Sequence, residues 1–228
     1  MDQSIRREVS DAGIATLTLD RPGSTANVFD SSTLDELNQH LDFLEMEKSA
    51  KGLIIRSAKQ KVFVAGADLN SFTKEMSAER IEAVIDRGQK TFERIARLPY
   101  PTVAAIHGVA LGGGFELALA CDYRIASSDG ATKLALPETT LGILPTWGGL
   151  TRLPRLIGLP NALEAIMTGR TYPAERALKL GMVDAVVFPE KLLAVAGAKI
   201  QRSAGTKRKS STHLPNRPPL SRLIKSQA

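Results

Sequence analysis

The chain has 228 residues, 43% of them hydrophobic, which predicts one sizeable globular domain or one domain with an appendage. Its single cysteine excludes an internal disulfide, and neither a secretory signal nor a membrane-spanning apolar run occurs, so we expect a cytoplasmic protein. The net charge is +6, and residues 199–225 include many basic residues and no acidic one. Because no aromatic residues interleave with these cations, this stretch favours a solvated linker over a surface that binds nucleic acid or membrane.

Strand patterns alternate with helical patterns along the chain, which argues for an α/β fold. Residues 5–9 and 14–19 flank Asp11-Ala12-Gly13 and predict a hairpin, while the helix at 174–180 ends at Gly181, a typical C-terminal cap. We predict strands at 5–9, 14–19, 52–57, 62–69, 103–106, 123–127, 133–136 and 183–187, and helices after 31–33 and at 78–98, 115–121, 149–157, 162–168, 174–180 and 190–201.

Two short motifs in the first half allow more specific predictions. Thr33 and Glu36 are spaced as a capping box at the start of the first helix. The strand at 62–69 breaks at Ala65-Gly66-Ala67-Asp68, where small residues leave backbone N–H groups accessible. This break is either a tight turn or a donor for a bound oxygen.

The most informative stretch is 103–121, where an apolar strand runs into Gly112-Gly113-Gly114 and then into an apolar helix that carries Glu116. A helix that begins at a glycine turn presents unpaired N–H groups, which stabilise an oxygen that acquires negative charge. A capping and packing role for these residues is the alternative. The apolar surroundings of Glu116 favour function, because a buried carboxylate is costly unless it is hydrogen-bonded or used.

Other kinds of site find less support in the sequence. The glycine triplet does not fit the spacing of nucleotide-phosphate loops. The His, Asp and Cys residues form no metal-binding spacing, so no metal is expected. A second carboxylate, Glu138, follows Pro137 at the end of the strand at 133–136.

Four segments together resemble the crotonase (enoyl-CoA hydratase/isomerase) superfamily. They are VFVAGADL at 62–69, IHGVALGGGFELALACDYRIAS at 106–127, LALPETTLGILPTWGGLTRLPRLIG at 134–158 and ALKLGMVD at 177–184. The resemblance spans about residues 5–195 and implies a spiral core of repeated ββα units followed by a C-terminal helical region, which is short here. It also implies a bound acyl-CoA thioester, no cofactor beyond the coenzyme A of the substrate, and a homotrimer or a dimer of trimers.

The resemblance also implies roles for individual residues. The catalytic carboxylates fall on Glu116 and Glu138, and the oxyanion-hole donors fall on the backbone N–H groups of Ala67 and Gly113. Trp147 stands where the family usually has a small residue, so it is either a packed core residue or a wall that shortens the acyl pocket. The expected substrate-binding and CoA-binding positions are Ala26, Ala65, Ala67, Asp68, Leu69, Leu111, Gly112, Gly113, Pro137, Glu138 and Gly142.

Because both carboxylates are present, the resemblance favours an enoyl-CoA hydratase of fatty-acid β-oxidation. The chain looks most like the hydratase half of bifunctional enzymes in which a 3-hydroxyacyl-CoA dehydrogenase follows, and no dinucleotide fingerprint occurs here. An enoyl-CoA isomerase, an acyl-CoA hydrolase and a truncated, non-catalytic acyl-CoA-binding subunit are the alternatives. We expect an acyl-CoA-binding domain at 1–200 and a basic, Pro/Ser-rich tail at 201–228 that is disordered or a linker remnant.

Overall fold

The computed structural model describes residues 3–68, 77–203 and 205–208. Its strands form a six-stranded sheet in the order β1-β2-β3-β5-β7-β10 and a four-stranded sheet in the order β4-β6-β8-β9. The strands are β1 (Ile5–Val9), β2 (Ile14–Leu19), β3 (Gly52–Ser57), β4 (Val62–Val64), β5 (Thr102–Ile106), β6 (Val109–Leu111), β7 (Tyr123–Ser127), β8 (Lys133–Ala135), β9 (Tyr172–Pro173) and β10 (Ala185–Val187). The helices are α1 (Ser31–Met46), α2 (Ala78–Arg97), α3 (Gly113–Ala120), α4 (Gly149–Ile157), α5 (Leu159–Thr168), α6 (Ala174–Leu180) and α7 (Leu192–Arg202), with short 3-10 turns η2 (Glu138–Leu141) and η3 (Pro189–Lys191).

The chain repeats one unit, in which a strand of the large sheet is followed by a strand of the small sheet and then by helical structure. The units β3-β4-α2, β5-β6-α3 and β7-β8-η2 follow one another, and equivalent strands pair in parallel within each sheet. This is the spiral of ββα units that the resemblance implied, so the predicted α/β, crotonase-like fold is confirmed.

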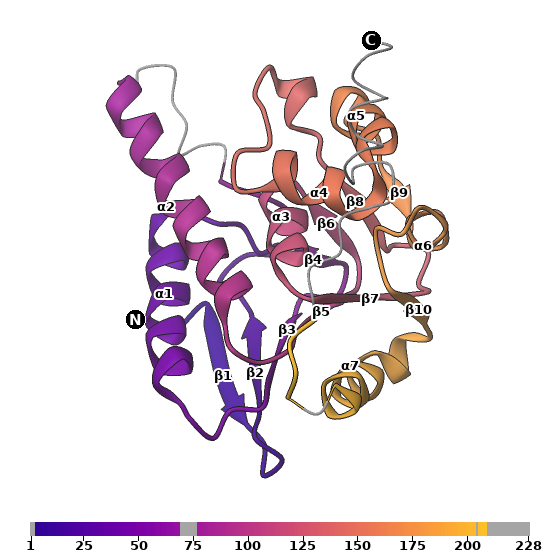
Figure 1. Ribbon diagram of the computed structural model, residues 1–228. Coiled ribbons are helices and arrows are strands. Elements are labelled where there is room, and N and C mark those ends of the chain that lie inside the picture. The colour runs from indigo at the N-terminus through magenta and orange to yellow at the C-terminus, as the bar shows by residue number, and fades with distance from the viewer. Residues whose placement is uncertain (1–2, 69–76, 204, 209–228) are drawn as a thin grey trace, which may run out of the picture.

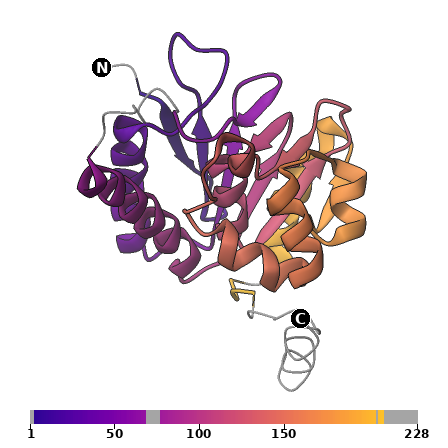
Figure 2. The same cartoon turned by 90° about the horizontal axis from the view of Figure 1, so that it is seen from above.

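Helices cover both faces of the large sheet. On one side α1 buries its leucine stripe, Leu34, Leu37, Leu41 and Leu44, as its helical spacing predicted. On the other side α7 packs Leu192, Ala196 and Ile200 against β-strand residues that include Ile54 and Val103. Seen from above, α1 and α2 lie together toward the left of the molecule, and α4, α5 and α6 lie toward the right (Figure 2). The helix α3 lies between these two groups (Figure 1).

The predicted capping box of the first helix is wrong. The N-cap residue of α1 is Asp30, whose carboxylate accepts a hydrogen bond from the Thr33 N–H at 2.8 Å. Glu36 reaches away from the helix and accepts from the backbone N–H groups of Ser4 and Ile5, each at 3.0 Å. Glu36 is therefore bonded to the segment that begins β1, a tertiary contact that local spacing does not reveal.

The structure also refines several predicted boundaries. The strand predicted at 62–69 ends at Val64, and beyond it Ala67 forms an isolated parallel bridge with Phe29. The short strands β6 and β9 were not predicted. The last helix, α7, runs to Arg202, past the expected domain boundary at residue 200.

Two basic residues just beyond α7 contact the body of the domain. The Lys207 ammonium donates to the backbone oxygen of Leu98 at 2.9 Å, and the Arg208 guanidinium pairs with Asp184 at 2.6 Å. Residues 209–228 lie outside the described residues, as does most of the predicted tail. In the part of the chain that the structure describes, no helix is long and apolar enough to cross a bilayer.

Candidate active site

The two candidate carboxylates are both buried. Glu116 lies in the first turn of α3, and every residue of that helix is buried, so its side chain is only 2% exposed. Glu138 begins η2, three residues after the end of β8, and is 8% exposed. Among the described residues, Glu138 Oε2 is a buried oxygen without a hydrogen-bond partner. Glu116 accepts a hydrogen bond from a backbone amide. Glu138 has one oxygen that is open to a ligand or to water.

A glycine turn brings a backbone donor to Glu116. The Gly149 N–H donates to Glu116 Oε1 at 2.8 Å. A Cβ at Gly149 would lie 3.1 Å from that oxygen and 2.9 Å from Pro145 Cβ, closer than side chains ordinarily tolerate. The preceding Gly148 has a φ of +121°, a conformation that L side chains rarely adopt. The Gly148-Gly149 pair thus lets the main chain approach the carboxylate.

The glycine triplet places a free helix-end amide beside the second carboxylate. Gly112 has a φ of +49°, and a Cβ there would lie 3.0 Å from Glu138 Oε1. The first hydrogen bond within α3 runs from the Glu116 N–H to the Gly112 oxygen at 2.9 Å. The Gly113 N–H, one residue into the helix, therefore has no acceptor in the preceding turn.

The backbone of Ala67 faces the same point. The Phe29 N–H donates to the Gly66 oxygen, and the Asp68 N–H donates to the Phe29 oxygen, both at 2.9 Å. Because successive residues of an extended chain direct their amides to opposite sides, the Ala67 N–H points away from Phe29. A Cβ at Gly113 would lie 3.6 Å from the Ala67 nitrogen. The amides of Ala67 and Gly113 are therefore neighbours, with the two carboxylates close by.

Burial shifts both carboxyl groups in the same direction. The pKa of Glu116 is raised to about 8, chiefly by burial and further by the nearby Glu138, against the lowering effect of the Gly149 and Trp147 amides and of Arg152. Burial likewise raises the pKa of Glu138 to about 7. Both groups consequently change protonation near neutral pH, where proton transfer by a side chain is most effective.

Backbone contacts describe several of the other predicted binding positions. Gly112 is bonded to β8 through its N–H and the Ala135 oxygen at 3.0 Å, and the Ala65 N–H donates to the Asn27 oxygen at 2.8 Å, next to Ala26. Gly142 ends η2 in a left-handed conformation, and a Cβ there would meet nothing within 4 Å. Leu69 lies outside the described residues.

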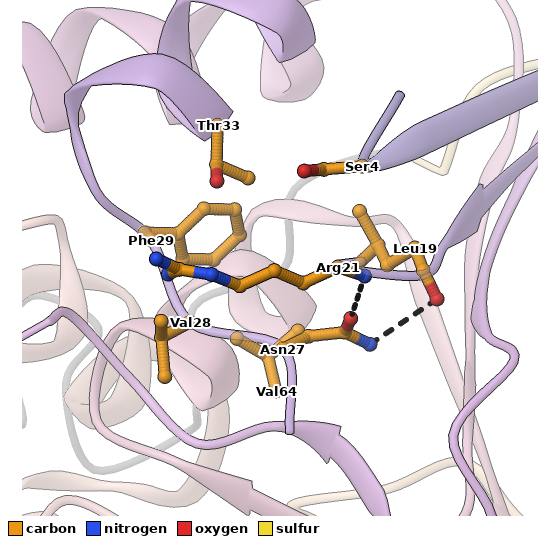
Figure 3. Close-up of a pocket in the computed structure, with 8 residues that line it drawn as sticks. All are labelled: Ser4, Leu19, Arg21, Asn27, Val28, Phe29, Thr33 and Val64. Carbon is orange, nitrogen blue, oxygen red and sulfur yellow. Dashed lines mark hydrogen bonds between the residues drawn. The ribbon is translucent and has the colours of Figure 1, made fainter. Parts of the chain in front are cut away.

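The Asn27 side chain holds the segment around Ala26 in place through hydrogen bonds, a role that the sequence analysis did not predict. Its side-chain amide donates to the Leu19 oxygen at 3.2 Å and to Ser57 Oγ at 2.9 Å, while its oxygen accepts from the Arg21 N–H at 2.9 Å (Figure 3). The cavity drawn there has a volume of about 10 Å³, room for about one water. This cavity beside Asn27 is a packing defect and is too small to hold a thioester. The only signal in the sequence was an asparagine near the predicted CoA segment.

Trp147 and its neighbours were also not predicted as site residues. The indole is 4% exposed and contacts the rings of Phe29 and Phe92 edge-on, with centroid distances of 6.1 and 5.5 Å. Of the two roles that the sequence left open for Trp147, the packed core residue is confirmed.

Among the described residues, no group of three or more His, Cys, Asp or Glu side chains is arranged to hold a metal ion.

Comparison with known proteins places this geometry in a family. The enoyl-CoA hydratase/isomerase family pattern matches residues 9–216. Curated relatives include the fatty acid oxidation complex subunit alpha of Aliivibrio fischeri, 47% identical over 200 residues (87% of this chain, 29% of the relative), and that of Vibrio vulnificus, 45% identical over 195 residues (86% of this chain, 28% of the relative). The chain thus spans less than a third of the length of these relatives.

Solved structures agree with this placement. An enoyl-CoA hydratase from Bacillus anthracis matches with a TM-score of 0.82 and 38% identity, over 89% of this chain and 77% of that one. Human mitochondrial delta3-delta2-enoyl-CoA isomerase also matches with a TM-score of 0.82, at 32% identity, over 89% of this chain and 78% of that one. The chain therefore belongs to the enoyl-CoA hydratase/isomerase family, the crotonase superfamily.

Proposed function

We propose that this chain is an enoyl-CoA hydratase of fatty acid oxidation, which adds water across the C2=C3 bond of a 2-enoyl-CoA thioester. One observation carries the proposal: two buried carboxylates, Glu116 and Glu138, lie beside a pair of neighbouring backbone amides. The names of the curated relatives supply the pathway, and an enoyl-CoA hydratase is among the matching structures.

The two amides suit the charge that forms during hydration. When water adds at C3, the electron pair of the double bond moves to the thioester oxygen and gives an enolate. The N–H groups of Ala67 and Gly113 would donate to that oxygen, and fixed donors of this kind are each worth about 3 kcal/mol of the barrier. They would also hold the thioester carbonyl before the reaction, which orients C3 toward the carboxylates.

The two carboxylates suit the proton transfers. One glutamate, ionised, would take a proton from the attacking water as its oxygen bonds to C3. The other, protonated, would deliver a proton to C2 as the enolate collapses. Because the pKa values of Glu138 and Glu116 are raised to about 7 and about 8, neutral pH supplies both protonation states within the pair. The unpartnered Oε2 of Glu138 is a ready acceptor for the water.

The acyl-CoA is proposed to enter along the backbone of 65–68 and the loop that contains Ala26. These two segments lie side by side, because the Ala65 N–H bonds to Asn27 and the Asp68 N–H bonds to Phe29. Backbone groups and small residues at such positions suit a large, flexible ligand that needs close approach more than side-chain specificity.

A Δ3-Δ2 enoyl-CoA isomerase is the second candidate. The human isomerase matches this fold as well as the Bacillus anthracis hydratase does, with the same TM-score of 0.82. In that reaction a carboxylate removes a proton from C2 of a 3-enoyl thioester, the same oxyanion donors hold the dienolate, and a proton returns at C4. A single carboxylate suffices for that transfer, so the two activities differ in their need for the pair.

The test follows the loss of the conjugated enoyl-thioester absorbance with crotonyl-CoA and with a longer 2-enoyl-CoA. We expect hydration by the wild type, and losses of about a hundredfold or more in both Glu116→Gln and Glu138→Gln, since each removes a proton-transfer group. Glu175→Gln, an exposed change on α6, is the matched control and should keep full activity.

Other outcomes identify the alternatives. Conversion of a 3-enoyl-CoA without hydration of 2-enoyl-CoA would assign an isomerase, and release of a free thiol would assign an acyl-CoA hydrolase. Binding of CoA esters without turnover would assign a non-catalytic subunit. Any of these three results contradicts the hydratase proposal.

A further inference from the structure

The indole of Trp147 is wedged between two helices by two glycines. Its Cδ1, Nε1 and Cε2 edge faces Gly88 of α2, where an added Cβ would overlap the ring. Its opposite edge, Cε3 and Cζ3, faces Gly113 at the start of α3, where an added Cβ would lie 2.8 Å away. One ring therefore spans the space between α2 and the glycine whose amide faces Ala67.

Two aromatic rings also pack against the indole. Phe29 and Phe92 meet it edge-on, with interplanar angles of 71° and 86°. Its Nε1 is buried and has no hydrogen-bond partner among the described residues, so contact between surfaces, and not a polar anchor, fixes its place. A group added on the Gly88 side is therefore expected to displace the indole toward Gly113.

The main chain of the same residue is tied to α2 and to Glu116. Arg152 donates to the Trp147 oxygen at 3.0 Å and to Glu93 of α2 at 2.8 Å. On the other side Gln89 of α2 donates to the Thr146 oxygen at 2.6 Å. Two residues further on, the Gly149 N–H holds Glu116. The loop that positions the carboxylate is thus hydrogen-bonded to α2 on both sides of the indole-bearing residue.

We propose that Trp147 is a positioning residue that sets the oxyanion site: its indole, seated on Gly88, holds the Gly113 amide in register with the Ala67 amide, while its loop holds Glu116. This inference rests on the proposed function, because it assigns the two amides to the thioester oxygen. It goes beyond that function in making Gly88, a residue of α2 with no place in the chemistry, a determinant of catalysis.

The test is a double-mutant cycle between positions 88 and 147. Gly88→Ala pushes the indole against Gly113, so we expect kcat to fall by about ten- to a hundredfold with little change in KM. In Trp147→Phe the narrower ring leaves room for the new methyl group. Adding Gly88→Ala to Trp147→Phe should then lower kcat by less than about threefold, a clear departure from additivity.

Two further measurements separate positioning from simple destabilisation. Gly197→Ala is the matched control, because a Cβ at this glycine of α7 meets nothing within 4 Å, and its kcat should equal that of the wild type. The second readout is the absorbance of the acetoacetyl-CoA enolate in the site. A bound enolate needs the two amides, so Gly88→Ala should raise the pH at which it forms, and the double variant should restore it.

The enolate readout also distinguishes the inference from the function on which it rests. If the wild type binds the enolate yet does not hydrate 2-enoyl-CoA, the hydratase proposal fails, and the enolate pH still tests Trp147. If Gly88→Ala lowers only the unfolding temperature, or affects kcat equally with Trp and Phe at position 147, the inference is overturned. Absence of enolate binding in the wild type overturns it as well.

Discussion

A carboxylate enclosed by apolar side chains is costly to ionise, and this protein encloses two. Glu116 sits in a helix of which every residue is buried, with the Gly149 amide as its close donor. Neutral backbone donors offset only part of the lost hydration of a charge, so the protonated form is favoured and the pKa rises. The same burial that suits proton transfer therefore makes the folded state less stable whenever Glu116 is ionised.

This burial predicts a pH dependence of stability. The unfolded Glu116 releases its proton near pH 4.5, and the folded one near pH 8. Between these values the folded state binds more protons, so the free energy of unfolding falls as pH rises, by at most about 1.4 kcal/mol per pH unit. Glu116→Gln removes this loss, and the variant should gain stability relative to the wild type from pH 5 to pH 8 in urea titrations.

The exposed Glu175→Gln serves as the control for that measurement. Its free energy of unfolding should stay within about 0.5 kcal/mol of the wild-type value, because substitutions at exposed positions usually change stability little. A constant difference between Glu116→Gln and the wild type across this range would contradict the raised pKa. Glu138→Gln should show the same trend over a narrower range, ending near pH 7.

At the scale of single residues, the sequence predicted burial better than it predicted contacts. The apolar residues around Glu116 in the sequence were enough to predict a buried carboxylate. Its donor, Gly149, lies 33 residues away, and no local pattern links the two. The same holds for Trp147, whose partners Gly88 and Gly113 come from two different helices. Local sequence carries periodicity and burial, while contacts between distant segments depend on the finished fold.

At the scale of elements, the long helices were identified by the periodicity of their buried residues, and the central strands β3 and β5 by short apolar runs that are buried almost throughout. Strands β6 and β9 were missed since they have three and two residues, too few to show alternation. The first helix was predicted, but its start was attributed to the wrong residue. Asp30, one turn earlier than expected for an N-cap at Thr33, supplies the carboxylate.

Asp30 is therefore expected to carry the cap of α1. Asp30→Ala removes the acceptor for the Thr33 N–H at 2.8 Å and the ion pair with Arg21 at 2.9 Å. We expect a loss of about 1–2 kcal/mol in the free energy of unfolding, measured by urea denaturation. Asp30→Asn keeps the cap and loses only the charge, so it should lose clearly less. Equal losses in both variants would assign the effect to the ion pair and contradict the capping role.

At the scale of the whole molecule, the stacked ββα units explain how one chain assembles the site. Parallel strands of the small sheet end side by side, so the segments that follow β4, β6 and β8 deliver Ala67, Gly113 and Glu138 to one place. The resemblance to the family implied that these residues share a site. Periodicity alone did not imply it, because it does not say which strands become neighbours.

The helix α7 covers the face of the large sheet opposite α1. Substitutions in α7 therefore test where the folded domain ends. Ile200 fills the space above Gly52 of β3, and a Cβ at that glycine would overlap it. Ile200→Ala should open a cavity and lower the free energy of unfolding by about 2–5 kcal/mol. Leu193 of the same helix is 38% exposed, so Leu193→Ala should change this free energy by less than about 0.5 kcal/mol. Unfolding monitored by circular dichroism should remain a single transition in both. If Ile200→Ala were as stable as Leu193→Ala, α7 would be an appendage, and the folded domain would end before Leu192.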